Sequence, residues 1–201
     1  MIFGPKYKIA RRLGANIFEK TQTQKFAARS ERKAASKSSY RPKGEYAVAM
    51  LEKQKVRFSY GVGERQFKKY VNEALAKKGA TVQALFERLE TRLDNVLYRL
   101  GLASTRQGAR QMTAHGHILV NGKRTNVPSQ TISLGDKISI RLASQKKPLF
   151  AATDEKMKKI ALPSWITYDA DKKVATLEGM PKYNAKEQLF NLGQVIEFYS
   201  R

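Results

Sequence analysis

The 201-residue sequence contains no cysteine and only two histidines, His115 and His117. Without cysteine the chain can form neither a disulfide nor a thiolate metal site, and a thiol nucleophile is excluded. The two histidines have no carboxylate near them in the sequence, so we expect no zinc and no other metal. No apolar run approaches the roughly 18 residues of a membrane-spanning helix, and no signal peptide is visible, so we expect no membrane partner.

Catalytic motifs are lacking as well. Gly61-Val62-Gly63 is too short and wrongly placed to be a phosphate-cradling loop. Asp94 has no titratable partner in a recognisable pattern, and it is better suited to orient an arginine or to cap a helix. The sequence therefore indicates a protein that is not an enzyme and uses no cofactor.

Acidic residues are scarce. The chain has 17 Asp and Glu against 39 Lys and Arg, which gives a net charge of +22. A surplus of this size favours an anionic partner, and nucleic acid is favoured over a membrane because no basic amphipathic anchor stands out. Residues 1–90 hold 21 basic and 8 acidic residues, whereas residues 144–201 hold 10 and 7. We therefore expect the binding surface in the first 143 residues.

The most informative segment is residues 92–124, and an absence marks it too: no Asp or Glu occurs between Asp94 and Asp136. A solvated basic face is the plain interpretation of such a run. The missing counter-charges favour instead an external polyanion that supplies phosphates. We expect an RNA-facing or structural role for the two histidines of this segment.

Local patterns in this segment predict two helices and a hairpin. An apolar face at the spacing i, i+3, i+4, i+7 predicts the first helix, and it consists of Leu93, Val96, Leu97 and Leu100. Ser104, followed by Gln107, predicts the start of a second helix that carries Arg106 and Arg110 on one face. Asn121-Gly122, after an alternating strand pattern, is a strong hairpin signal.

The rest of the chain predicts a basic, loosely ordered extension over residues 1–44 and helices over residues 46–58, 64–78 and from Thr81. Short strands follow residue 124, and residues 153–160 predict a short helix. The tail is rich in β formers at residues 164–168 and 195–199, which predict strands. The expected fold class is α+β.

Several motifs together resemble a small RNA-binding domain named after bacterial small-subunit ribosomal protein four. They are Arg92, Leu93 and Asp94; Thr105, Arg106, Ala109 and Arg110; and residues 117–122. The likeness extends over nearly the whole chain, at residues 4–6, 11–14, 51–57, 60–61, 64–67 and 196–200. The chain is accordingly identified as a member of the bacterial and plastid family of small-subunit ribosomal protein four.

The resemblance implies a structural constituent of the small (30S) ribosomal subunit that binds 16S rRNA at a junction in its 5′ domain and nucleates assembly of the subunit body. It further implies contacts with ribosomal proteins three, five and twelve, a contribution to translational accuracy with five and twelve, and contact with mRNA at the entrance tunnel. The implied location is the ribosome, cytoplasmic or organellar. The implied domains are an N-terminal extension (1–44), a helical domain (45–90), an inserted RNA-binding domain of two helices and a small antiparallel sheet (91–143), and a β-rich tail (144–201) that packs onto residues 45–90.

The expected rRNA-binding residues combine the basic faces with the resemblance. They are Lys6, Lys8, Arg11, Arg12, Lys53, Gln54, Lys55, Arg57, Tyr60, Arg65, Gln66, Lys68, Lys69, Arg92, Asn95, Arg99, Arg106, Arg110, Gln111, His115, His117, Asn121, Gly122, Lys123 and Arg124. Candidates for the mRNA-facing surface are Lys37, Arg41 and Lys43.

The sequence departs from the family at two places. Many relatives carry zinc-binding cysteines near the N-terminus, where this chain has Tyr7, Ala10 and similar residues. A Gly-Gln-His-Gly-like stretch is also missing near residues 40–44. The rival interpretations are an RNA-modifying enzyme or a ribosome quality-control factor with the same domain; only 58 residues follow Ala143, too few for a large catalytic domain. A DNA-binding transcription factor would need helix-turn-helix spacing, which the sequence does not show.

Overall fold

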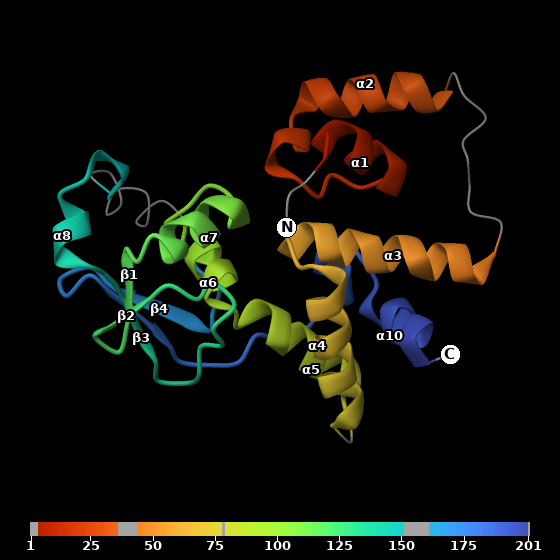
Figure 1. The fold of residues 1–201 in the computed structure, drawn as a ribbon. Helices are drawn as coiled ribbons and strands as arrows, with labels where there is room; N and C mark the ends of the chain where they lie inside the picture. The colour runs from red at the N-terminus through yellow and green to blue at the C-terminus, as the bar shows by residue number, and fades with distance from the viewer. Residues whose placement is uncertain (1–3, 36–43, 78, 151–160, 201) are drawn as a thin grey trace. The chain divides into compact units, whose positions relative to one another are not determined.

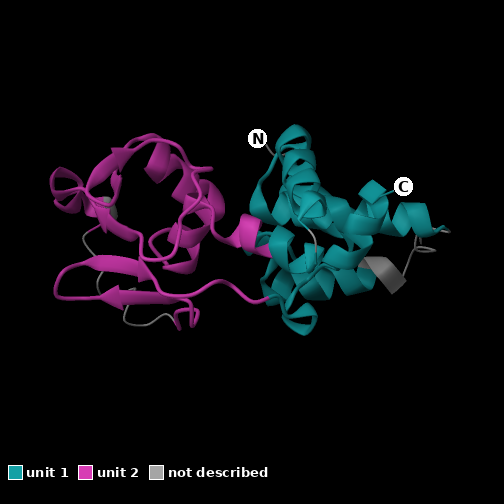
Figure 2. Cartoon of the chain, turned by 90° about the horizontal axis from the view of Figure 1, so that it is seen from below, with its two compact units in different colours: residues 1–85, 183–201 teal, residues 86–182 magenta. Residues whose placement is uncertain are grey.

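The computed structural model describes residues 4–35, 44–77, 79–150 and 161–200. The chain divides into two compact units (Figure 2). The first comprises residues 1–85 together with 183–201, and the second comprises residues 86–182. Among the described residues, no helix is both long enough and apolar enough to cross a membrane.

The first unit is built from helices (Figure 1). In chain order they are α1 (Lys6–Leu13), η1 (Glu19–Thr21), α2 (Gln24–Ala35), α3 (Glu45–Tyr60), α4 (Glu64–Ala76), the first half of α5 (Thr81–Glu90), η3 (Ala185–Glu187) and α10 (Leu192–Ser200). Helix α3 begins after Gly44 and ends at Gly61, whose φ of 66° suits a glycine helix stop. Helix α10 packs along α3, so residues far apart in the sequence complete one bundle.

The described part of the second unit combines short helices and the second half of α5 with a five-stranded antiparallel sheet. Its elements are α6 (Leu93–Arg99), α7 (Arg106–Ala114), β1 (Ile118–Val120), β2 (Lys123–Thr125), β3 (Lys137–Ile140), α8 (Leu142–Gln145), η2 (Pro148–Phe150), β4 (Ile166–Asp169) and β5 (Val174–Leu177). The strand order is β2-β1-β3-β5-β4, in which Ile118 pairs with Ile140 and Ile138 pairs with Ala175. The α+β fold class is as the sequence predicts.

The core of the second unit explains why the apolar spacing of residues 93–100 predicted a helix correctly. The four predicted residues Leu93, Val96, Leu97 and Leu100 are fully buried in one apolar cluster with the sheet. The spacing i, i+3, i+4, i+7 places them on a single side of α6, which is the side that packs inward. Gly101, with φ of 76°, follows the end of this helix.

The N-terminal segment is more ordered than its composition suggested. Residues 4–35 form α1, η1 and α2 around a small cluster of Ala10, Leu13, Ile17 and Phe18. Side chains of α3, including Phe58, pack against this cluster. The expected loose extension is therefore wrong for residues 4–35, because the few apolar residues of this segment meet on one side and are covered by α3.

The tail differs from expectation in two ways. Strand β4 confirms the strand predicted at residues 164–168, but residues 195–199 belong to helix α10. Moreover, β4 and β5 join the sheet of the second unit, and only residues 183–201 belong to the helical unit. The tail therefore does not pack as one piece onto residues 45–90. The helix predicted at residues 153–160 lies outside the described residues.

Candidate nucleic-acid interface

Two buried carboxylates organise the arginines of the second unit. Asp94, which is 2% exposed, accepts hydrogen bonds at Oδ1 from Arg92 Nε (3.0 Å) and at Oδ2 from Arg92 Nη2 (2.6 Å). Its Oδ2 also accepts from Arg110 Nη2 at 3.0 Å. Because a buried carboxylate is costly unless paired, these contacts fix both guanidinium groups. Asp94 thus orients arginines, as its sequence position suggested.

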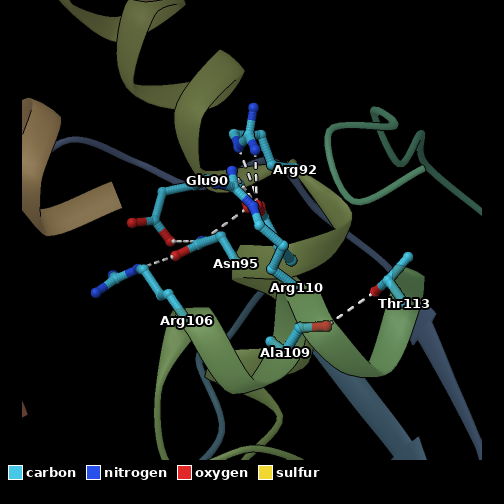
Figure 3. Close-up of polar contacts among 8 residues, drawn as sticks. Glu90, Arg92, Asn95, Arg106, Ala109, Arg110 and Thr113 are labelled. Atoms are coloured by element: carbon cyan, nitrogen blue, oxygen red, sulfur yellow. Dashed lines mark hydrogen bonds and ion pairs between the residues drawn. The ribbon is translucent and has the colours of Figure 1, made fainter. Parts of the chain in front are cut away.

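Glu90 holds the second group of contacts (Figure 3). Its carboxylate accepts from Asn95 Nδ2 at 2.8 Å, as the figure shows. It also accepts from Arg99 Nε at 2.9 Å and Nη2 at 2.8 Å. Asn95 in turn accepts at Oδ1 from Arg106 Nε at 2.7 Å. The Arg106 guanidinium lies over the Tyr98 ring, 4.4 Å from its centroid. A chain of polar contacts therefore runs from a buried acid to an arginine on α7.

Part of the positive charge of the acid-free segment is thus neutralised by acids that precede it in the sequence. Glu90 and Asp94, which lie before the acid-free run, pair with Arg92, Arg99 and Arg110. Arg92 and Asn95 are each 1% exposed and serve inside the network, so their side chains do not form the surface that the sequence predicted. The side chains of Arg99 and Arg110 are 32% exposed. These two reach the surface while anchored from within.

Helix α7 presents the predicted pair of arginines. Its N-cap is Thr105, whose Oγ1 accepts from Gly108 N at 2.9 Å, so the helix begins one residue later than the Ser104 pattern indicated. Arg106 and Arg110 lie at i and i+4 of this helix and share one face. Near the C-terminal end of α7, the buried Thr113 hydroxyl donates to the Ala109 carbonyl of the same helix at 3.0 Å (Figure 3). The helix itself therefore satisfies this hydroxyl.

The β1–β2 hairpin confirms the Asn121-Gly122 prediction. Both residues have positive φ, 50° and 77°, and Val120 pairs with Lys123 across a two-residue turn. The Asn121 side chain donates to Asp136 Oδ1 at 2.8 Å and accepts from Lys137 N at 2.9 Å, which ties the turn to β3. Lys123 is exposed just beyond this anchored tip.

Arg124, His115 and His117 converge at the turn between α7 and β1. Gly116 has a φ of 68°, a conformation that favours glycine, and the Arg124 guanidinium lies against it, where a Cβ would project. His117 is half-buried; its Nδ1 lies 2.9 Å from Ser144 Oγ, and its ring meets Phe150 edge-on at 5.7 Å. Burial, followed by the charges of Lys147, His115, Arg124 and Arg141, lowers the pKa of His117.

Two cations of this cluster, Arg141 and Lys147, were not predicted as site residues. A signal was present, because the sequence has no acidic residue between Asp136 and Asp154, a second acid-free run beyond the first. Ser144 also belongs to this cluster, through its contact with His117.

No group of three or more acidic or histidine side chains that could hold a metal occurs in the part of the chain that the structure describes.

The predicted contact face on α3 and α4 splits into two sets. Lys53 is 8% exposed and Tyr60 is 3% exposed. Lys53 Nζ lies 3.1 Å from Glu64 Oε1 and 4.6 Å from the Phe198 ring centroid, and Arg57 Nη1 lies 2.6 Å from Glu64 Oε2. Lys53 and Arg57 therefore join α3 to α4 instead of facing outward. Lys55 and Gln54 are half-buried and make contacts within α3, to Glu52 and Arg57 respectively. The exposed set consists of Arg65, Gln66, Lys68 and Lys69.

Glu64, whose side chain is 46% exposed, is the shared partner of Lys53 and Arg57. Burial raises its pKa, but hydrogen bonds from Tyr199 and Lys53 and the charge of Arg57 outweigh this and lower the pKa overall. The Tyr199 hydroxyl donates to Glu64 Oε1 at 2.6 Å, and burial together with this bond raises the pKa of Tyr199. The contacts of Glu64 therefore join α3, α4 and α10.

The remaining predicted residues lie on α1 in the first unit and on α7 and the β1–β2 hairpin in the second. On α1, Lys8, Arg11 and Arg12 are exposed, whereas Lys6 is half-buried with its Nζ 5.7 Å from the Phe18 ring centroid. On α7 and its end, Gln111 and His115 are exposed, as are the hairpin residues Asn121 and Gly122. Lys37, Arg41 and Lys43 lie outside the described residues.

Comparison with known proteins places this arrangement in a family. The family described as Ribosomal protein S4/S9 N-terminal domain matches residues 2–90, and the S4 domain matches residues 91–138. A protein of Akkermansia muciniphila is 37% identical over 98% of both chains. Proteins of Laribacter hongkongensis and Neisseria meningitidis are 37% and 38% identical, also over 98% of each chain. All three are named small ribosomal subunit protein uS4. The chain therefore belongs to the uS4 family of small ribosomal subunit proteins, which are structural components of the ribosome and not enzymes.

Proposed function

We propose that the chain binds small-subunit ribosomal RNA through a surface of the second unit that we call the α7–hairpin surface. It consists of Arg106, Arg110, Gln111, His115, Lys123 and Arg124. The observation that supports this most directly is the anchoring of Arg106 and Arg110 on Asn95 and Asp94. An arginine fixed from behind loses less side-chain entropy when it meets a phosphate.

The charge balance supports the same conclusion. Glu90 and Asp94 are the acids of the network, while Arg92, Arg99, Arg106 and Arg110 all belong to it, so a positive surplus remains at its outer side. Folded RNA is recognised largely through its shape, by contacts to phosphates and 2′-hydroxyls. Rigid cations on a helix and at a hairpin tip fit that mode of binding.

We further propose, from the family resemblance, that the target is 16S rRNA at a junction in its 5′ domain and that binding nucleates assembly of the subunit body. Contacts with ribosomal proteins three, five and twelve, a role in accuracy, and an mRNA-facing surface belong to the same proposal. The exposed cations of α1 and α4, namely Lys8, Arg11, Arg12, Arg65, Lys68 and Lys69, provide the first unit with a second surface for RNA.

The test is a salt titration of binding to a small-subunit rRNA transcript. The double variant Arg106→Gln with Lys123→Gln removes two charges without touching Glu90 or Asp94. We expect weaker binding and a shallower dependence of log K on log salt, by about 0.7–0.9 for each lost phosphate contact.

The matched control is Lys172→Gln with Lys182→Gln, which removes two exposed charges outside the surface; the Lys172 side chain is 79% exposed on the β4–β5 turn. An unchanged slope in the first variant, or an equal change in both, would exclude the α7–hairpin surface from the interface.

A further inference from the structure

A pocket of about 490 Å³ opens in the first unit between α1 and α2. Tyr7 and Arg11 line it from α1, and Lys25, Phe26 and Arg29 line it from α2. The hydroxyls of Thr23 and Ser30 complete the lining. Among the predicted rRNA contacts only Arg11 belongs to this set, so the pocket is a feature that sequence patterns did not indicate.

The pocket joins an aromatic platform to a cluster of cations. The rings of Tyr7 and Phe26 lie 5.5 Å apart at 34°, and Tyr7 is 48% exposed. Arg11, Lys25 and Arg29 are exposed around these rings, and no carboxylate is among the lining residues. An exposed ring beside cations suits a ligand that has both a flat π-surface and a negative charge.

The platform is held in place on its inner side. Phe26 packs against the small core of Ala10, Leu13, Ile17 and Phe18. Arg11 Nε donates to the Tyr7 carbonyl at 3.1 Å, which keeps the arginine beside the ring one turn away. The pocket is therefore lined by side chains that the fold positions, and its size lies in the range of small-ligand sites, about 300–1,000 Å³.

The chemistry selects among ligand classes. A metal ion is disfavoured because the lining offers three cations and no carboxylate or imidazole. An uncharged apolar ligand would leave those cations near a low-dielectric surface without compensation. A nucleotide satisfies both parts, because a base stacks on an aromatic ring and its phosphate meets arginine and lysine.

We propose that this pocket binds one unpaired nucleotide of the RNA, with its base on the Tyr7–Phe26 pair and its phosphate at Arg11, Lys25 and Arg29. The proposal rests on the RNA-binding function proposed above and assigns a subsite to it. It adds Tyr7, Lys25, Phe26 and Arg29 to the contacts of the first unit.

The experiment uses the full-length chain and a small-subunit rRNA transcript. Tyr7→Leu keeps an apolar side chain on Phe26 but removes the stacking surface, and Tyr7→Phe restores it. We expect Tyr7→Leu to lower affinity by about 5- to 150-fold, the range for one base–ring stack, with an unchanged salt slope. Tyr7→Phe should bind as the unaltered chain does, and photo-crosslinking should join RNA to Tyr7 or Phe26.

A pair of charge variants on α2 separates the pocket from its surroundings. Arg29→Gln removes a lining cation, whereas Arg32→Gln removes an exposed cation of the same helix that does not line the pocket. We expect Arg29→Gln to reduce the salt slope more than Arg32→Gln does. Circular dichroism of all variants checks that the helix content is unchanged.

The outcomes distinguish the two proposals. If the unaltered chain fails to bind the transcript at low salt, the proposed function fails. If it binds, but Tyr7→Leu binds equally well and no crosslink reaches Tyr7 or Phe26, the nucleotide pocket alone is refuted. Titration with AMP and UMP tests a free nucleotide as the source: tight binding of either, without a crosslink to the transcript, would also overturn the proposal.

Discussion

At the scale of single residues, two buried acids decide where the basic groups of the second unit point. Asp94 accepts from Arg92 and Arg110, and Glu90 accepts from Arg99 and Asn95. Long basic side chains normally sample many rotamers, and an ion pair at their base restricts them. The acids therefore contribute to binding without touching a ligand, since they fix the cations that do.

Asp94→Asn tests this role. The substitution keeps the shape of the side chain but leaves two guanidinium groups beside a neutral amide, one of them buried. Breaking a buried ion pair typically costs about 3–5 kcal/mol of unfolding free energy, and we expect a loss of this order in urea denaturation. The exposed Asp171→Asn serves as the control and should change stability little. Equal stability of the two variants would show that the Asp94 pairs are not structural.

His117 provides a prediction about pH. Its pKa is lowered from the ordinary value of 6.5, so the unfolded chain takes up a proton at a higher pH than the folded chain does. Stability contributed by neutral His117 is therefore present above about pH 6.5 and is lost as the pH falls through the lowered folded pKa. We expect His117→Asn to lose less stability than the unaltered chain between about pH 7.5 and pH 5.5.

Urea unfolding of the variant and of the unaltered chain at several pH values measures this difference. An identical pH dependence of His117→Asn and the unaltered chain would assign the effect to other groups.

At the scale of elements, sequence patterns predicted correctly those elements whose conformation depends mainly on residues near in sequence. The apolar face of α6 and the Asn121-Gly122 turn depend on neighbours in sequence, and the structure confirms both. Residues 195–199 did not follow their β propensity because Val195 is buried and Phe198 and Tyr199 contact Lys53, a spacing that a helix provides. The pairing of Asp94 with Arg110, sixteen residues apart, likewise depends on how α6 packs on α7 and is not visible in sequence patterns.

Helix α10 can be tested through its buried anchor. Val195 is fully buried, so Val195→Ala should destabilise the first unit by about 1–3 kcal/mol even though alanine favours helix. Thermal unfolding followed by circular dichroism measures the loss. Val127→Ala makes the same change at a position that is 49% exposed and should be nearly neutral. If both variants unfold alike, α10 does not contribute through this residue.

At the scale of the whole molecule, composition indicated the class of partner but not which basic residues are buried and which are exposed. The net charge of +22 favoured a polyanion, and membership of the uS4 family is consistent with that. Composition could not show that several predicted contacts, such as Lys53 and Arg92, are committed to the interior. Nor could it show that the sheet continues past the S4 domain match at residue 138 through β5 and β4.

The division of the chain has a consequence for its synthesis. The first unit includes residues 183–201, where the backbone N–H of Asn191 donates to Glu52 Oε2 at 2.8 Å and α10 packs on α3. The second unit lies wholly within residues 86–182. A nascent polypeptide emerges from its amino end, and domains usually mature in that order. Here the order is inverted, because all residues of the second unit are synthesised before α10, which completes the first unit.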